Sequence, residues 1–435
     1  MKLYSTANHN LSVDFKTAVF NSLPADKGLY MPTILPQLDA AMMQSWDKKT
    51  LPQIAFDVAY TLLNEVISAH DLKAIIDDAI NFEAPLHTLS GDTFVLELFH
   101  GPSLAFKDFG GRFMSRIMAH FLKNEHKEIK ILVATSGDTG GAVALGFLNV
   151  PGISVSILYP KGKVSAIQEL QLTTNGNNIE AIEIDGTFDD CQRLVKQAFL
   201  DDELNAHINL TSANSINISR LIPQMFYYAY TWARLKADFE ELVFITPSGN
   251  FGNIAAGIIA HKMGLPVKQF IAATNSNDIV PQYFKTGIYT ARPSVATLAN
   301  AMDVGAPSNF IRILDMYNND IEALRTKLIS LSYTDAQIKN AIATVYKNNN
   351  YILCPHTATG YLAVEEVQKS NTKNTAYIIL ATAHPCKFPD VFEELHIKIE
   401  EPTQVETMKQ KQQHKVLMRN SFDDFKAHLL VKNKY

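Results

Sequence analysis

Short apolar runs rich in branched residues recur along this chain and alternate with segments of helical periodicity. The runs lie at 94–98, 129–134, 155–159, 179–184, 242–245, 270–273 and 376–381. Each has the length and composition of a strand that is buried on both faces. After the first run, apolar residues recur at helical spacing from Phe106 to Phe121. Strands that alternate with helices predict parallel sheets covered by helices on both faces, which is an α/β fold.

The length of the chain predicts several domains. At 435 residues it exceeds what one hydrophobic core usually supports. Residues 1–90 contain mainly helical patterns with one short extended piece at 28–32, and we interpret them as a separate N-terminal unit. We expect a smaller α/β domain over 91–230, a larger α/β domain over 231–400 and a C-terminal helical extension over 401–435.

Composition and charge exclude several classes of protein. Hydrophobic residues make up 47% of the chain and charged residues 19%, which predicts a packed globular protein. The formal net charge is -5 and the lysines and arginines are dispersed, so we expect no nucleic-acid partner. The 3 cysteines are widely spaced and no metal-binding spacing of cysteine or histidine is present, so we expect no metal.

The apolar runs also bear on location. None approaches the roughly 20 residues that cross a bilayer, so we expect no membrane partner. The first residues of the chain lack the apolar stretch of an export signal. A cytoplasmic location is therefore expected.

Three loops that follow predicted strands are rich in glycine and small polar residues. They span 135–141, 246–253 and 381–389. Ligands of open parallel sheets bind at the carboxyl ends of the strands, so we expect these loops to form the active site. The N–H groups of the first loop suit an anion such as a carboxylate, and Gly249 and Gly252 of the second allow close approach to a phosphate. Each loop taken alone also fits a plain turn or a capped helix.

Lys107 lies at the start of the helix predicted from the apolar pattern. A cation beside a helix N-terminus has the unfavourable sign, and apolar neighbours such as Phe106 disfavour its charge. Both effects favour the neutral amine, which is the form that condenses with a carbonyl group. The alternative is that the Lys107 side chain reaches solvent beside Asp108.

Several segments together resemble the threonine synthases of the longer-chain branch. They are Gly28-Leu29-Tyr30-Met31-Pro32, Leu104-Ala105-Phe106-Lys107-Asp108-Phe109-Gly110, Ser136-Gly137-Asp138-Thr139-Gly140, Asn214-Ser215-Ile216-Asn217 with Arg220, Pro247-Ser248-Gly249-Asn250-Phe251-Gly252-Asn253 and Thr382-Ala383-His384-Pro385. These motifs run in order nearly from end to end of the chain, which makes the resemblance very specific.

The resemblance implies both a fold and an activity. The fold is that of fold type II pyridoxal 5'-phosphate (PLP) enzymes, related in architecture to the tryptophan synthase β-subunit. It has two parallel-sheet α/β domains and a mainly helical N-terminal unit. The implied activity converts O-phospho-L-homoserine and water to L-threonine and phosphate by γ-elimination and β-addition of water. The implied oligomeric state is a monomer.

The resemblance also implies how the cofactor is bound. Lys107 is expected to hold PLP as an internal aldimine and then to move protons among the substrate carbons. The pyridine nitrogen is expected at Thr382, whose hydroxyl stabilises a pyridinium less than a carboxylate does. The cofactor phosphate is expected at Gly249, Asn250, Phe251 and Asn253.

The remaining candidates are implied to bind the substrate. Its carboxylate is expected at Ser136, Gly137 and Thr139. Its phosphate is expected at Ser215, Asn217 and Arg220. Asp138 departs from the asparagine that many fold type II enzymes place beside the phenolic oxygen of the cofactor, and a carboxylate there needs a shared proton. We expect the cleft to close on the substrate, because water must arrive only after elimination.

Two other functions stay open at this point. A serine or threonine dehydratase uses the same lysine and phosphate loop on a substrate without a phosphate, so replacement of Arg220 separates the two activities. A protein that binds a phosphorylated metabolite or a protein partner without turnover is the second alternative. The retention of Lys107 with an intact phosphate loop argues against it.

Overall fold

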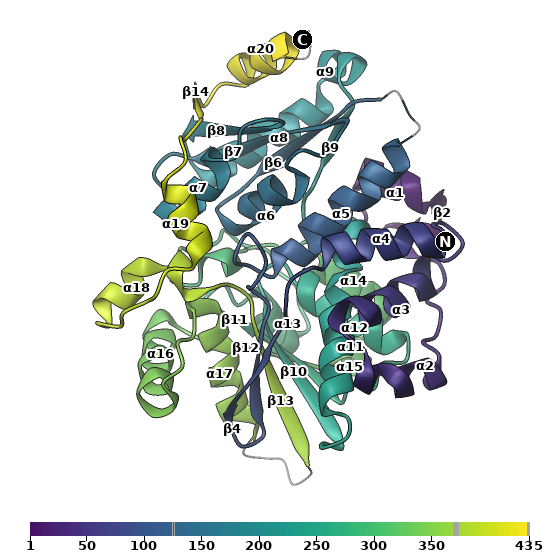
Figure 1. Ribbon diagram of the computed structural model, residues 1–435, viewed down its shortest axis with the longest axis vertical. Helices are drawn as coiled ribbons and strands as arrows, with labels where there is room; N and C mark the ends of the chain where they lie inside the picture. The colour runs from purple at the N-terminus through teal and green to yellow at the C-terminus, as the bar shows by residue number, and fades with distance from the viewer. Residues whose placement is uncertain (124, 126, 369–373, 433–435) are drawn as a thin grey trace.

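The structure is a computed structural model that describes residues 1–123, 125, 127–368 and 374–432. Its described residues form three sheets (Figure 1). The smaller parallel sheet lies near the top of Figure 1, the larger sheet lies below it, and the N-terminal unit lies at the right. None of the described helices is both long enough and apolar enough to cross a membrane.

The larger sheet has six strands in the order β12-β11-β10-β13-β5-β4. All neighbours are parallel except β4, which is antiparallel to β5. Helices cover both faces: Phe244 of β10 packs in one core with α11 and α12, and Ile245 packs in a second core with α16 and α17. The bounds are β4 (Leu86–Ser90), β5 (Thr93–Glu97), β10 (Glu241–Pro247), β11 (Gln269–Thr274), β12 (Leu328–Ser332), β13 (Thr375–Ala381), α11 (Gln224–Leu235), α12 (Gly252–Lys262), α16 (Asp335–Asn349) and α17 (Pro355–Val367).

The smaller sheet has five parallel strands in the order β14-β8-β7-β6-β9. One face packs against α5 and α6, and the other packs against α8 and α20. The bounds are β6 (Ile129–Ala134), β7 (Ile153–Pro160), β8 (Ile179–Asp185), β9 (Leu210–Ser212), β14 (Val416–Arg419), α5 (Lys107–Leu122), α6 (Asp138–Phe147), α7 (Ala166–Thr173), α8 (Phe188–Leu200) and α20 (Phe422–Lys432).

The N-terminal unit contains a three-stranded antiparallel sheet in the order β2-β1-β3. The sequence predicted only its third strand, at 28–32. The other two were missed because β1 is only 4 residues long and β2 is rich in polar residues and largely exposed, so neither shows an apolar run. The bounds are β1 (Lys2–Ser5), β2 (Asn8–Asp14), β3 (Tyr30–Pro32), α1 (Phe15–Asn21), α2 (Ala40–Gln44), η1 (Ser45–Lys48), α3 (Leu51–Leu63) and α4 (Ala69–Ala79).

Every strand predicted from the apolar runs forms, and the parallel α/β architecture is confirmed. Two strands belong to a different sheet from the one that the expected domain ranges predict. β5 lies in the expected smaller domain but pairs with β13, and β14 lies in the expected C-terminal extension but pairs with β8. Strand pairing is non-local, so local patterns give no partner. Residues 433–435 of that extension lie outside the described residues.

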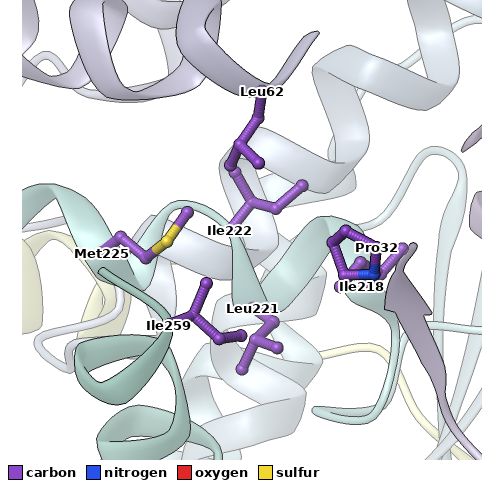
Figure 2. A pocket seen from close by; sticks show the side chains of 7 residues that line it. All are labelled: Pro32, Leu62, Ile218, Leu221, Ile222, Met225 and Ile259. Atoms are coloured by element: carbon purple, nitrogen blue, oxygen red, sulfur yellow. The ribbon is translucent and has the colours of Figure 1, made fainter. Parts of the chain in front are cut away.

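The remaining elements connect these layers. They are α9 (Asp202–His207), α10 (Ile218–Leu221), α13 (Ile279–Thr286), η2 (Asn300–Met302), α14 (Phe310–Met316), α15 (Ile321–Arg325), η4 (Pro385–Lys387), α18 (Pro389–Glu394) and α19 (Thr403–Lys409). The N-terminal unit packs on α10 and α12 around a small cavity (Figure 2). All seven lining side chains are apolar, so this cavity offers no polar group to orient an anion.

Candidate active site

Two loops meet at the start of α5. The backbone N–H of Phe106 donates to the carbonyl of Thr382 at 2.9 Å, and an antiparallel bridge joins Ala105 to Ala383. Lys107 follows directly as the first residue of α5. The segment between β5 and α5, residues 98–106, is called the lysine loop below. It is therefore fixed to the loop that leaves β13, and Lys107 and Thr382 lie close together.

Lys107 has the electrostatic surroundings of a reactive amine. It is partly buried, and its Nζ lies 5.2 Å from the ring centroid of Phe106. No carboxylate of the described residues forms an ion pair with it. Burial lowers the pKa of Lys107 from 10.5 to about 8; Asp138 opposes this shift, and Lys387 and Arg220 add to it. The direction of this shift favours the neutral amine, in line with the expectation from the sequence.

The alternative partner of Lys107, Asp108, points away from it. Its Oδ2 accepts the backbone N–H of Ser103 at 2.8 Å, and the side chain is fully buried. Burial raises the pKa of Asp108 to about 6. A Cβ added to Gly101 would lie 2.4 Å from Oδ2 of Asp108. The Asp108 side chain therefore packs against the backbone of Gly101 and shapes the lysine loop.

Asp138 is held by an ion pair that the sequence did not reveal. Its Oδ1 lies 2.7 Å from Nζ of Lys387 and accepts Nε2 of Gln168 at 3.0 Å. Both charged side chains are buried. Burial alone raises the pKa of Asp138, but Lys387 and Lys107 together hold it well below its ordinary value. Asp138 is therefore ionised.

The loop between β6 and α6 presents backbone donors. Gly137 has a φ of 142°, a conformation that glycine favours, and its N–H donates to Oγ1 of Thr135 at 3.0 Å. The N–H groups of Asp138 and Thr139 in the first turn of α6 have no acceptor within the helix. Ser136 is exposed beside them. These groups are placed to bind an anion at the helix N-terminus.

The second loop forms a donor-lined turn at the start of α12. Phe251 has a left-handed φ of 60° just before the helix. A Cβ on Gly249 would lie 2.7 Å from Cα of Met302, so the chain passes too closely there for any side chain. Asn250 is exposed, and its Oδ1 accepts the N–H of Ser308 at 3.0 Å, which fixes the turn.

Asn253 has a fixed orientation in this turn. Its Oδ1 accepts the hydroxyls of Tyr227 at 2.7 Å and Tyr228 at 2.9 Å. Its Nδ2 is buried and has no hydrogen-bond partner among the described residues. A buried donor without a partner is costly, so this group indicates a bound acceptor such as a phosphate oxygen.

Arg220 is a buried cation near Lys107. Its Nη1 donates to the carbonyl of Ala213, and its Nε is buried without a partner among the described residues. A Cβ on Gly110 would lie 3.2 Å from that Nε, which places the guanidinium against α5. Burial lowers the pKa of Arg220 to about 10, and Asp108 opposes this shift. Such a cation suits an anionic ligand.

Ser215 and Asn217 have different surroundings. Ser215 is partly exposed, and its Oγ lies 3.5 Å from Nδ2 of Asn309. Asn217 is fully buried; its Nδ2 donates to Val19 O at 2.8 Å and to Ser22 Oγ at 2.7 Å. Both hydrogens of that amide are used, so the expected contact of Asn217 with a substrate phosphate has no donor left. Its Oδ1 caps α10 and so positions Arg220.

Arg312 is a further residue that sequence patterns missed. It is fully buried, and its Nη2 donates to Ile216 O at 2.6 Å and to Tyr30 O at 3.2 Å. Its Nη1 donates to Asn309, whose N–H in turn donates to the carbonyl of Asn250. Arg312 therefore links the N-terminal unit, the segment before α10 and the α12 turn.

Cations outnumber carboxylates among the buried and partly buried side chains of these loops and of the helices beside them. The cations include Lys107, Arg220, Arg312 and Lys387, and the carboxylates include Asp108 and Asp138. An excess of buried positive charge favours anionic ligands. No cluster of metal-ligating side chains occurs in the part of the chain that the structure describes.

Three family profiles together match almost the whole chain. Residues 82–382 match the family profile "Pyridoxal-phosphate dependent enzyme", residues 2–80 match "Threonine synthase N terminus" and residues 357–429 match "Threonine synthase, C-terminal". The threonine synthase of Haemophilus influenzae is 41% identical over 99% of this chain and 100% of that protein. The threonine synthase of Escherichia coli is 41% identical over 90% of each chain.

Solved structures of threonine synthases have the same fold as this chain. A PLP-bound threonine synthase from Brucella melitensis superposes with a TM-score of 0.94 at 32% identity over 100% of both chains. The Escherichia coli threonine synthase superposes with a TM-score of 0.91 at 38% identity, over 99% of this chain and 100% of that one. Maize serine racemase, at 14% identity and a TM-score of 0.55 over 83% of this chain and 98% of that one, shares the fold alone.

Proposed function

This chain belongs to the threonine synthase family of PLP-dependent enzymes, and on that basis we propose that Lys107 is the residue to which the cofactor binds covalently. Its activity is that of a threonine synthase, a lyase that converts O-phospho-L-homoserine and water to L-threonine and phosphate. The observation that carries the assignment is the Lys107 amine itself, which lacks an ion-pair partner among the described residues and has a pKa lowered to about 8.

The side chains around Lys107 fit PLP. The unpartnered Nδ2 of Asn253 and the free N–H groups at the start of α12 suit the cofactor phosphate. Gly249 and Phe251 give that turn its close approach and its shape. Thr382 lies beside the lysine loop, where its hydroxyl can meet the pyridine nitrogen. The bound cofactor supplies an electron sink for the carbanions that form when the substrate loses protons.

Different residues of the chain then act on different groups of the substrate. The Lys107 amine takes and returns protons at the substrate carbons, for which a pKa near the working pH is favourable. The N–H groups of the loop with Ser136, Gly137 and Thr139 orient the substrate carboxylate. Arg220 holds the substrate phosphate and stabilises its charge as it leaves, with the Ser215 hydroxyl as a further donor.

The domain assignment, the closure of the cleft, the monomeric state and the cytoplasmic location belong to the same proposal. Sheet membership supports 93–97 as part of the larger domain and 416–419 as part of the smaller one. Closure excludes water until phosphate has left. Hydrogen exchange with and without a substrate analogue tests closure, and light scattering tests the monomer.

The direct test uses purified protein with PLP and O-phospho-L-homoserine. Inorganic phosphate and threonine are measured together, the latter by chromatography, for the wild type and for Lys107→Ala. We expect both products from the wild type and neither from the variant. Phosphate without threonine would indicate a lyase that releases an unsaturated product, and equal activity of Lys107→Ala would contradict the role of Lys107.

A further inference from the structure

A buried ion pair joins the two α/β domains beside Lys107. Lys387 ends η4, in the loop that follows β13 of the larger sheet, and its side chain is 0% exposed. Asp138 begins α6 on the smaller sheet. Nζ of Lys387 lies 2.7 Å from Oδ1 of Asp138 and donates to Ser103 O at 2.9 Å. The pair therefore links both domains and the lysine loop.

The position of this pair indicates a role other than stabilising the fold. Removing two charges from water costs so much that a buried pair rarely stabilises a fold more than apolar side chains of the same size. The pair is also held in place on both sides: Gln168 donates to Asp138, and Gln171 Nε2 donates to the same Ser103 carbonyl at 2.8 Å. These contacts fix the orientation of the Asp138 carboxylate toward Lys387.

The charged and titratable groups that face Lys107 come from several elements. They are Asp138 on α6, Lys387 on η4, Arg220 on α10, His356 on α17 and, on its own helix, Asp108. Burial lowers the pKa of His356 to about 4, so it is neutral. Asp108 is turned toward Ser103. Asp138 is thus the carboxylate with the strongest pull on the Lys107 amine.

We propose that Lys387 is a positioning residue that holds the Asp138 carboxylate by an ion pair and so keeps the Lys107 amine free to react. Without Lys387, Lys107 is the remaining cation of this set that attracts the Asp138 carboxylate. The two would pair, and the amine would be held protonated. This inference rests on the proposed role of Lys107 as the cofactor-binding residue.

The sign of the effect follows from the two charges. Asp138 raises the pKa of Lys107 and Lys387 lowers it. Loss of the Lys387 charge, as in Lys387→Met, therefore raises the pH at which Lys107 becomes neutral. Loss of the Asp138 charge, as in Asp138→Asn, lowers that pH, because Lys387 and Arg220 then act unopposed.

The experiment measures how fast full-length, cofactor-free protein captures added PLP, as the visible absorbance band of the covalently bound cofactor grows. The rate rises with the neutral fraction of Lys107 and levels off above its pKa. For Lys387→Met we expect the midpoint to rise by about one pH unit, so that capture near pH 7 slows about tenfold. Asp138→Asn should shift the midpoint downward, and Lys387→Arg should stay near the wild type.

The matched control is Lys339→Met, which removes a partly exposed lysine paired with Glu394 on the surface. Its midpoint should not move. An unmoved midpoint in Lys387→Met, or an upward shift in Asp138→Asn, would overturn the proposal. If Lys387→Met fails to fold by circular dichroism, the direction of the shift in Asp138→Asn decides. A wild type that never forms the band contradicts the proposed function instead, because the role of Lys107 itself then fails.

Discussion

The loops that precede α6 and α12 share one backbone design but differ in charge. Each leaves a parallel strand, turns through a positive φ and opens a helix. The α6 loop contains Asp138, whose charge is matched by Lys387 from the other domain. The α12 loop, 246–253, contains no acidic residue and ends at Asn253, whose buried amide donor has no protein partner in the described residues.

This difference teaches that the backbone alone does not select the ligand. A helix N-terminus attracts any anion. The α12 turn carries no negative charge and leaves the Asn253 Nδ2 donor without a partner among the described residues, which suits the dianionic phosphate of the cofactor. In the α6 loop an internal carboxylate already stands at the helix start, so a ligand there meets backbone donors beside a neutralised charge pair. Side-chain charge therefore distinguishes the two loops.

The largest expected effect comes from adding a charge to the α12 turn. Asn253→Asp keeps an oxygen for the hydroxyls of Tyr227 and Tyr228 but replaces the free donor by an anion. We expect PLP affinity to fall by about 4 kcal/mol, or roughly a thousandfold. Asn10→Asp, at an exposed position of β2 in the N-terminal unit, is the control and should leave PLP affinity unchanged. Equal losses in a fluorescence titration with PLP would contradict the role of Asn253.

The second effect separates the substrate phosphate from the cofactor phosphate. Arg220→Met removes a buried cation while the α12 turn stays intact. We expect the affinity for O-phospho-L-homoserine to fall by about 3 kcal/mol, with a much smaller change in PLP affinity. Arg116→Met, which removes a partly exposed partner of Asp78, is the control. Loss of PLP affinity in Arg220→Met alone would place Arg220 at the cofactor instead.

A smaller effect tests the shape of the α12 turn. The Cβ of Gly249→Ala would lie 2.7 Å from Cα of Met302 and 2.9 Å from Ala301 O, so the turn must shift. Overpacking of this kind costs about 1 to 2 kcal/mol. We expect PLP affinity to fall by about that amount, and the melting temperature with PLP to fall with it, because a more weakly bound ligand stabilises the folded protein less. Unchanged affinity would show that the close approach at Gly249 does not serve the cofactor.

The smallest effect concerns the orientation of Asn253. Tyr227→Phe removes one of two hydroxyls that hold its Oδ1, and Tyr228 still donates at 2.9 Å. We expect a loss of PLP affinity of about 0.5 to 1 kcal/mol. The double variant with Tyr228→Phe should lose more than the sum of the two single losses, because the amide is then free to rotate. Strict additivity in the same titration would argue against a shared role.

Sequence patterns predicted the parts of this site that are local. Buried strands are apolar runs, and the turns after them carry glycine and asparagine, so β6, β10 and their loops were found. The lowered pKa of Lys107 also followed from its neighbours. The polar strand β2 was missed because it is exposed and gives no apolar run.

Contacts between segments that lie far apart in the chain could not be predicted from local sequence patterns. Lys387 lies in a predicted loop, but nothing in its neighbours indicates that it meets Asp138. The same holds for Arg312, whose acceptors are backbone carbonyls of Tyr30 and Ile216 that leave no trace in side-chain identity. The hydrogen bonds that Asn217 Nδ2 donates to Val19 and Ser22 are likewise set by the tertiary fold.

The central claim is that Lys107 holds the cofactor, and two lysines of this site are chemically able to do so. The most direct measurement reduces the protein with borohydride after addition of PLP, digests it and locates the added mass by peptide sequencing in the mass spectrometer. We predict that the cofactor is found on Lys107 and that Lys387 is unmodified. Modification of Lys387, or of another lysine while Lys107 stays free, would contradict this account.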